Sequence, residues 1–163
     1  MRDSECFIPD LAYVIEKDSQ IIGHINYSLG SIDNKIEAPV LGPVAVHRDY
    51  QNQGFGSKLI EYTLDIAENM GFPFVFVIGD ENYYRRFGFE SASKYNIWLD
   101  GTDKSGECEF FMIRIFDETE LNIEGGIFYN PSVFDVCESD VDEFDRQFEY
   151  LEKKVFDTQL KEL

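Results

Sequence analysis

Basic residues are scarce in this sequence. Its 163 residues include 14 Lys and Arg against 32 Asp and Glu, a formal net charge of −18. Nucleic-acid phosphates attract a surplus of positive charge, so this balance argues against nucleic acid as a partner. No apolar run approaches the roughly 20 residues of a membrane span, and MRDSECFIPD lacks a signal-peptide core. We therefore expect a cytoplasmic protein that binds neither nucleic acid nor membranes.

Metal-ligating residues are scarce as well. The three cysteines, Cys6, Cys108 and Cys137, are far apart and form no CxxC pair. Only His24 and His47 are available to complete a zinc set, and their spacing matches no zinc motif. The sequence thus predicts reduced thiols without a nucleophilic role, and no metal site.

The acidic residues are unevenly distributed. Residues 117–163 carry 14 acids and 4 bases, a net charge of −10. Without internal repeats or a Pro/Gly/Ser linker, the chain is expected to form one domain over 1–163, with an acidic C-terminal extension from about residue 117. Such an excess is typical of a solvated face that aids solubility. The alternative is attraction of a cationic substrate or partner.

Hydrophobic patterning predicts a mixed fold. Short apolar segments bounded by turn signals predict strands at 12–16, 21–28, 37–46, 74–78 and 110–116. Apolar residues three and four apart predict a helix from Gly56 to Met70, and a short helical segment follows at 81–87. Pro39 and Pro43 predict an irregular, splayed edge for the strand that contains them. The order indicates an α/β (α+β) protein with one parallel crossover.

The C-terminal extension has a pattern of its own. From Ser139 onward, charged residues alternate with Phe144, Phe148, Leu151 and Val155. These apolar positions are three or four residues apart, so we expect an amphipathic C-terminal helix.

A glycine-rich loop lies between the predicted strand at 37–46 and the predicted helix. Its sequence is QNQGFG, from Gln51 to Gly56. Glycines remove side chains from the loop, and the N–H groups at a helix N-terminus are unpaired and partly positive, so the backbone alone can bind a phosphate. The loop matches neither a Walker motif nor GxGxxG, because no Lys-Ser/Thr follows and the residue three after Gly56 is Leu59.

QNQGFG resembles the Gln/Arg-x-x-Gly-x-Gly/Ala motif of the general-control-related N-acetyltransferases, the GNAT superfamily. Further features occur in the family's order: LGPVAV before the loop, the helix after it, and YYRRFGF at 83–89, which is similar to the Tyr-x-x-x-Gly-Phe signature. The chain is most similar to a bacterial subgroup with a YYxRFGF sequence. This resemblance implies a mixed, mostly antiparallel sheet with a splayed central pair, flanked by helices.

The resemblance also implies a cofactor and its site. In the family, acetyl-CoA donates the acetyl group, its diphosphate lies on the glycine-rich loop, and its pantetheine arm pairs with the preceding strand. Mapped onto this sequence, the cofactor-binding residues are Val44, Ala45, Val46, Gln51, Asn52, Gln53, Gly54, Phe55, Gly56 and Ser57. The family's Tyr four residues before the Gly-Phe pair protonates the thiolate leaving group. That residue is Tyr84 here, and the N–H of Val46 is the candidate that polarises the thioester carbonyl.

Other roles stay open. The candidate cations for the nucleotide phosphates are Arg48, Lys58, Arg85 and Arg86. The candidate general bases are His24, His47, Glu37 and Asp80, and each is equally compatible with a surface or structural role. The acceptor is expected to be a primary amine on a small molecule or a protein.

The N-terminal part departs from the family pattern. Family members open with a strand and two helices before the first hairpin, and only about ten residues precede it here. We expect these elements to be absent, and a second subunit or the C-terminal helix to cover the sheet face that they would leave. The chain is thus expected to be a homodimer. Three functions follow: an acetyltransferase, a catalytically weak CoA-binding sensor, or an interaction protein that uses the acidic C-terminus.

Overall fold

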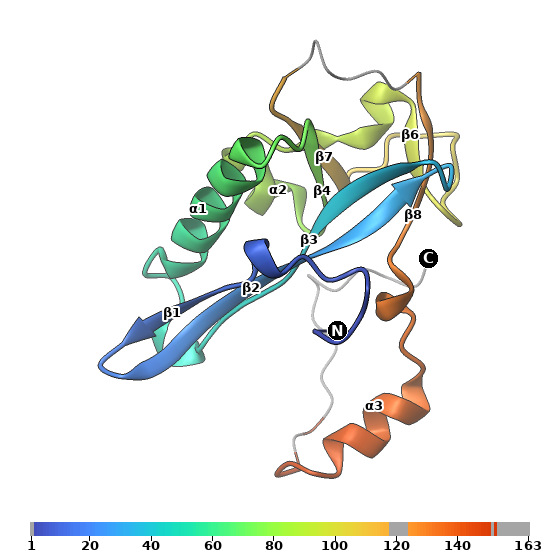
Figure 1. Cartoon of the computed structure of the whole chain (residues 1–163). Helices are drawn as coiled ribbons and strands as arrows, with labels where there is room; N and C mark the ends of the chain where they lie inside the picture. Colours follow the sequence, from blue (N-terminus) through green and yellow to red (C-terminus); the bar gives the residue numbers. More distant parts are fainter. Residues whose placement is uncertain (1, 118–123, 151, 153–163) are drawn as a thin grey trace.

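A computed structural model describes residues 2–117, 124–150 and 152 (Figure 1). The strands are β1 (Tyr13–Lys17), β2 (Gln20–Ile32), β3 (Ile36–Val46), β4 (Phe74–Ile78), β5 (Glu90–Ser91), β6 (Ile97–Leu99), β7 (Phe111–Ile115) and β8 (Gly126–Tyr129). The α-helices are α1 (Phe55–Asn69), α2 (Glu81–Tyr84) and α3 (Glu138–Asp145). Among these residues no helix is both long and apolar enough to cross a bilayer.

The strands form one mixed sheet in the order β5-β7-β4-β3-β2-β8-β6, and β1 pairs with the outer edge of β2. The pairs β3–β4 and β6–β8 are parallel and the others antiparallel. This confirms the predicted mixed, mostly antiparallel sheet. Before β1 the described chain forms a single bridge between Phe7 and Ser28 and a 3₁₀ turn at Pro9–Leu11.

The central parallel pair is splayed. β3 and β4 pair only at Val40 with Phe76 and at Leu41 with Val77. Beyond Leu41, β3 continues to Val46 beside β2, with no β4 partner on its other side. Half of the backbone groups in this last part of β3 therefore face a gap rather than a neighbouring strand.

Helix α1 connects these two strands and packs on one face of the sheet (Figure 1). Its buried side chains are Leu59, Ile60, Thr63, Leu64 and Ala67, the three-and-four spacing that predicted the helix. The Tyr27 hydroxyl of β2 pairs with Thr63 Oγ1 at 2.9 Å, so both of these buried hydroxyls have a hydrogen-bond partner.

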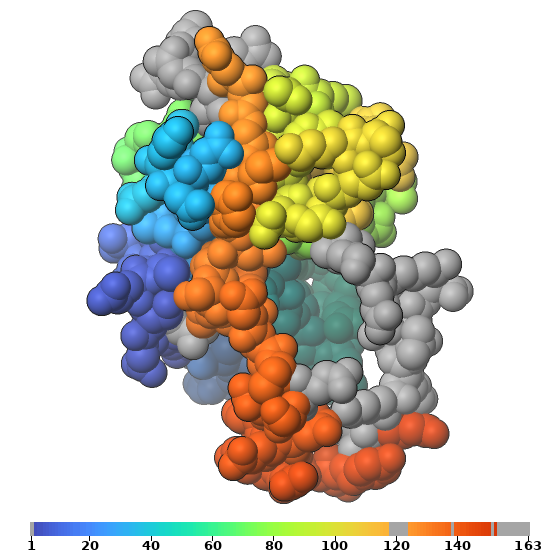
Figure 2. All heavy atoms as spheres, turned by 90° about the vertical axis from the view of Figure 1, so that its right-hand side faces the viewer, coloured from blue at the N-terminus to red at the C-terminus, as the bar shows by residue number. Residues whose placement is uncertain are grey.

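The opposite face of the sheet carries a second, aromatic core. Phe76, Phe111 and Phe128 come from β4, β7 and β8, and their ring centroids are 4.7–5.2 Å apart. All three are fully buried, and burial of each ring is worth about 1.5–3 kcal/mol. In Figure 2 the segment that contains β8 runs down this side of the molecule between the β2–β3 turn and the residues around 100.

Strands β5, β6 and β8 were not predicted. Each has two to four residues, too few for an alternating pattern to be read. β8 pairs with Ser31 and Ile32, the extension of β2 beyond its predicted end at Ser28. These strands therefore depend on pairing between distant segments rather than on local pattern.

The C-terminal segment forms a helix, α3, that is shorter than its pattern predicts, and among the described residues it does not supply the expected cover for the sheet. α3 ends at Asp145, and Phe144 and Phe148 are 58% and 62% exposed. Their rings contact each other with centroids 5.1 Å apart. α3 lies apart from the sheet in Figure 1, so it does not cover a sheet face. Leu151 and Val155 lie outside the described residues.

Candidate functional site

The glycine-rich loop closes at the N-terminus of α1. Asn52 and Gly54 have positive φ values of 58° and 83°, and Gly54 is the residue immediately before the helix. No side chain caps this end of α1. Among the described residues, the N–H groups of Phe55, Gly56 and Ser57 have no hydrogen-bond acceptor, whereas that of Lys58 donates to the Gly54 carbonyl. The arrangement is a concave row of donors suited to an anion.

Two glutamines hold the loop. Gln51 Nε2 donates to the carbonyl of Val46 at 3.0 Å, which ties the loop to the end of β3. Gln53 Nε2 donates to the carbonyl of Asp49 at 3.1 Å. Gln53 is the one predicted cofactor-binding residue that does not line the cavity described below, and its side chain serves the loop itself.

The exposed edge of β3 directs backbone groups into the gap beside β4. The N–H of His47 donates to the Ile22 carbonyl of β2 at 2.7 Å. Because N–H directions alternate along a strand, the N–H of Val46 points the opposite way, into the gap. An extended ligand that enters the gap can pair with β3 as an additional strand.

Tyr84 ends α2 and faces the same gap. It is 9% exposed and packs edge-on against Tyr83 and Phe89, with centroids 5.0 and 5.8 Å away. Burial raises the pKa of its phenol to about 12, and repulsion from Tyr83 adds to the shift. Tyr84 therefore stays protonated at neutral pH and can donate a proton or a hydrogen bond.

These groups line one cavity of about 540 Å³. The residues around it are Val44, Ala45, Val46, Tyr50, Gln51, Asn52, Gly54, Phe55, Gly56, Ser57, Tyr83, Tyr84 and Arg86. All predicted site residues except Gln53 are among them. Tyr50 was missed, since nothing near it in sequence marks it apart from the loop itself. Tyr83, the first residue of the YYRRFGF motif, was given no role in the sequence-based prediction.

Of the four candidate cations, Arg86 alone lines this cavity. Its guanidinium lies 4.0 Å from the centroid of the Tyr83 ring, and its Nε donates to the Tyr83 carbonyl at 3.0 Å. Arg85 pairs with Glu81, and Arg48 is exposed beside Asp49.

Two lysines approach the loop from outside the cavity. Lys58 Nζ lies 6.0 Å from the Phe55 ring centroid. Lys17, which the sequence did not single out, lies 5.1 Å from the ring of Tyr50. The loop is therefore a local basic region of an acidic protein.

None of the four candidate bases lines the cavity. Asp80 caps α2 by accepting the N–H of Asn82 at 2.9 Å, and Glu37 lies at the other end of β3. His47 is exposed and accepts the N–H of Asp49. His24 lies opposite Ala45 in the sheet register, and its buried Nδ1 has no partner among the described residues.

The cysteines are free, as expected. Cys108 is buried, and burial raises the pKa of its thiol, which disfavours the nucleophilic thiolate. In the part of the chain that the structure describes, no three His, Cys, Asp or Glu side chains are grouped to hold a metal ion.

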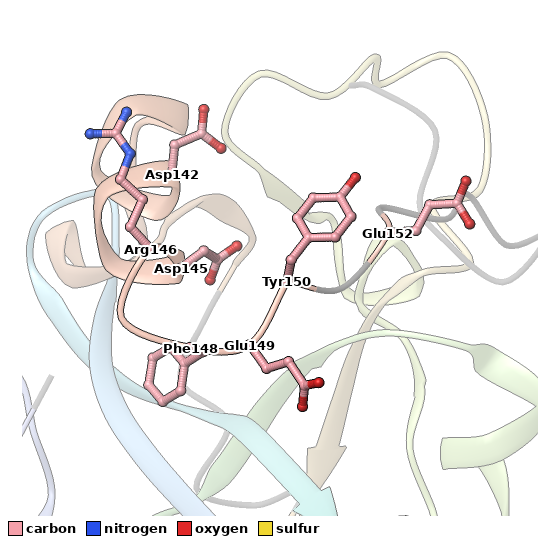
Figure 3. A pocket seen from close by; sticks show the side chains of 7 residues that line it. All are labelled: Asp142, Asp145, Arg146, Phe148, Glu149, Tyr150 and Glu152. Carbon is pink, nitrogen blue, oxygen red and sulfur yellow. The ribbon is translucent and has the colours of Figure 1, made fainter.

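A second and larger cavity, of about 920 Å³, lies in the C-terminal segment. Its lining residues are Asp142, Asp145, Arg146, Phe148, Glu149, Tyr150 and Glu152 (Figure 3). The carboxylates point in different directions rather than toward a common centre. No predicted site residue belongs to this cavity.

The splayed sheet, the unpaired N–H groups at the N-terminus of α1 and the buried phenol beside the gap are the features that the resemblance to the GNAT superfamily implies. Residues 9–91 match the model of the acetyltransferase (GNAT) domain. The chain therefore belongs to the GNAT family, as the resemblance predicted.

Relatives in Escherichia coli agree. The uncharacterized N-acetyltransferase YjhQ of strain K12 is 32% identical over 96 residues, 57% of this chain and 53% of YjhQ. The chain thus spans about half the length of that relative. The uncharacterized N-acetyltransferase YhbS of the same strain is 28% identical over 119 residues, 71% of this chain and 68% of YhbS.

Two solved structures have the same fold. The crystal structure of YhbS in complex with CoA aligns with a TM-score of 0.66 at 25% identity, over 76% of this chain and 68% of that chain. A GNAT family acetyltransferase from Brucella melitensis in complex with acetyl-CoA aligns with a TM-score of 0.58 at 29% identity, over 74% of this chain and 66% of that chain.

Proposed function

We propose that this chain transfers an acetyl group from acetyl-CoA to a primary amine, by direct attack of the amine within a ternary complex. The observation that carries the proposal is the convergence of three features on one cavity. These are the unpaired N–H groups of α1, the unpaired edge of β3 and the phenol of Tyr84. The complexes of YhbS with CoA and of the Brucella protein with acetyl-CoA support the choice of donor.

In this proposal the diphosphate of acetyl-CoA lies on the N–H groups of Phe55, Gly56 and Ser57. Arg86 adds the positive charge that backbone amides lack. The pantetheine arm pairs with Val44–Val46, and other family-derived positions, Gln51, Asn52 and Gly54, shape the loop. The whole chain, 1–163, acts as a single acetyltransferase-like domain.

The chemical step uses two groups of this chain. The N–H of Val46 hydrogen-bonds the thioester carbonyl and stabilises the oxyanion that forms when the free amine attacks. As the C–S bond breaks, the Tyr84 hydroxyl hydrogen-bonds the thiolate of CoA and transfers its proton to the sulfur. The attacking nitrogen releases a proton to solvent and the Tyr84 phenolate takes one up from solvent, so both groups return to their neutral forms.

One observation favours a second candidate, a CoA-binding sensor with little turnover. Within the described residues, no carboxylate or imidazole lines the cavity to take the proton from an ammonium group. An acetyltransferase with this site would draw its free amine from the small deprotonated fraction in solution, and its rate would rise with pH.

The test is a calorimetric titration of the chain with acetyl-CoA, followed by an assay for free CoA. The acceptor probes are spermidine, an aminoglycoside and a lysine-containing peptide. Micromolar binding with CoA release that depends on one probe supports the enzyme. Micromolar binding without release in the presence of any probe supports the sensor, and absence of binding overturns both.

A further inference from the structure

Gly79 lies between the end of β4 and Asp80, the residue that caps α2. Its N–H donates to the carbonyl of Phe110 at 2.9 Å, which fixes its backbone to the strand region before β7. A Cβ placed on Gly79 would lie 2.6 Å from Cε2 and 3.2 Å from Cδ2 of Tyr84. Carbon atoms in ordinary contact are 3.4–4 Å apart, so no side chain fits while the Tyr84 ring stays in place.

This contact departs from a local rule of helix starts. The residue before an N-cap and the fourth residue of the helix commonly bear hydrophobic side chains that pack together. Here those positions are Gly79 and Tyr84, with Asp80 as the cap. Instead of meeting a side chain, the Tyr84 ring lies directly against the Gly79 backbone. Local rules are broken most often where function requires it.

From this geometry we infer that Gly79 is the positioning residue for the general acid: its missing side chain lets the Tyr84 ring lie against β4 with its hydroxyl toward the acetyl-donor cavity. The inference rests on the proposed function of Tyr84. Gly79 itself does not line the cavity. A substitution at Gly79 must therefore affect turnover by changing the position of the Tyr84 ring.

The position of the Tyr84 ring is constrained from several sides. The backbone N–H of Tyr84 donates to the Asp80 carbonyl at 3.1 Å, so the helix turn holds the Tyr84 backbone in place. Tyr83 and Phe89 contact the ring edge-on. A methyl group on Gly79 would force the Tyr84 ring to turn, and its hydroxyl would move with it. A displacement of about 1 Å in a catalytic group lowers turnover by about 100-fold.

Tyr83 is set by a different glycine. A Cβ on Gly56 would lie 3.0 Å from the Tyr83 hydroxyl, at the first turn of α1. The two adjacent tyrosines of α2 therefore pack against different segments. Tyr83 contacts the first turn of α1, next to the loop that would bind the diphosphate, and Tyr84 contacts Gly79 at the end of β4.

The experiment is a double-mutant cycle with Gly79→Ala and Tyr84→Phe. With the acceptor probe that supports turnover, we expect Gly79→Ala to lower kcat about 100-fold and to leave the calorimetric Kd for acetyl-CoA within about 2-fold. In the Tyr84→Phe background, the same change should lower kcat no further, because no hydroxyl remains to be positioned. Equal losses in both backgrounds, an unchanged kcat, or a lost acetyl-CoA affinity would each overturn the inference.

Gly30→Ala is the matched control for crowding. A Cβ there would lie 2.5 Å from Phe128 Cζ and 2.6 Å from the Tyr129 carbonyl oxygen, so it introduces a clash at least as severe at a position that does not line the cavity. Both single variants should lower the melting temperature, but only Gly79→Ala should lower kcat at a temperature where both are folded.

A readout without turnover separates this inference from the proposed function. With 3-fluorotyrosine in place of Tyr84, the ¹⁹F resonance should shift in Gly79→Ala and stay in place in Gly30→Ala. An unmoved resonance in Gly79→Ala overturns the positioning role even if the chain is an active enzyme. A shifted resonance in a chain that does not bind acetyl-CoA supports the geometry and overturns the proposed function alone.

Discussion

Two cavities of this molecule are built in opposite ways. The smaller one collects its lining from β3, the loop after it, α1 and α2, segments that the fold brings together. The lining residues described for the larger one all come from α3 and the short stretch after it, between Asp142 and Glu152. In the first, Tyr84 is buried and wedged between other rings, whereas in the second Tyr150 is 87% exposed.

The contrast shows that size is a poor guide to a reactive site. A group can stabilise a transition state when its surroundings hold it in place before the substrate arrives. The smaller cavity meets this condition through packed aromatic rings and backbone N–H groups. The C-terminal cavity offers charge without fixed geometry, which suits weak, long-range attraction.

The largest effect that separates the two regions is expected from Gly54→Asp. Gly54 has a φ of +83°, which an L residue adopts at a cost of about 1–2 kcal/mol, and a carboxylate there would face the bound diphosphate. We expect the affinity for acetyl-CoA to fall by more than about 100-fold, measured by calorimetry.

The matched control is Gly71→Asp. Gly71 has a φ of +86° and, like Gly54, open space where a Cβ would stand, but it follows the C-terminal end of α1. It therefore carries the same backbone strain and the same added charge away from the cavity. Similar losses of affinity in both variants would mean that stability, not the phosphate site, explains the first result.

The next largest effect is expected from Tyr84→Phe. Loss of a general acid lowers turnover by about 100-fold or more, while the ring still fills its place and the Kd for acetyl-CoA stays within about 2-fold. Tyr62→Phe, on the exposed side of α1, is the control and should keep full turnover. Full activity of the Tyr84→Phe variant would mean that another group acts as the general acid.

These two residues also show how far sequence reasoning reached. Gly54 and Tyr84 belong to compact motifs, and α1 has a strong three-and-four period, so local sequence was sufficient to predict them. Gly79 carries no motif, and its importance depends on a contact with Tyr84 that only the folded chain displays. Strand β8 was missed for the same reason, since its partner Ser31 is almost a hundred residues earlier.

In the C-terminal segment the pattern was misleading. The spacing of Phe144 and Phe148 is that of a buried helix face, but periodicity reports only which residues share a face, not what that face contacts.

The homodimer stays a prediction that sizing with light scattering would test. A monomeric mass would overturn it.

Alkaline pH should lower the stability of the fold through its two buried tyrosines, Tyr27 and Tyr84. An unfolded tyrosine ionises near pH 10, whereas burial raises the pKa of Tyr84 to about 12 and that of Tyr27 further. Both folded-state pKa values lie above the unfolded one, so the stability contribution is complete below pH 10 and is lost as pH rises. Each phenol should reduce the free energy of unfolding by at most about 1.4 kcal/mol per pH unit between pH 10 and 12.

Urea denaturation at pH 10, 11 and 12 measures this slope. Tyr84→Phe should reduce the average slope by about 1 kcal/mol per pH unit, because one of the two buried phenols is removed and the limiting slope of one proton is about 1.4 kcal/mol per unit. Tyr150→Phe, in the C-terminal segment, should retain the full slope, because both buried phenols remain. A Tyr84→Phe variant with an unchanged slope would contradict the burial of that hydroxyl.

The smallest effect concerns the acidic segment. A variant that removes the four carboxylates lining the C-terminal cavity combines Asp142→Asn, Asp145→Asn, Glu149→Gln and Glu152→Gln. We expect an unchanged Kd for acetyl-CoA. With spermidine as acceptor, we expect a 2- to 5-fold higher KM at about 10 mM salt, and this increase should disappear at about 0.5 M salt because screening abolishes long-range attraction.

A control with equal loss of charge carries Asp18→Asn, Glu37→Gln, Asp100→Asn and Glu107→Gln, all exposed. If both variants raise KM equally, total charge attracts the acceptor and the C-terminal segment has no special part. If only the first variant raises KM, the C-terminal segment attracts the acceptor locally. The C-terminal segment then recruits the acceptor, and the smaller cavity carries out the chemical step.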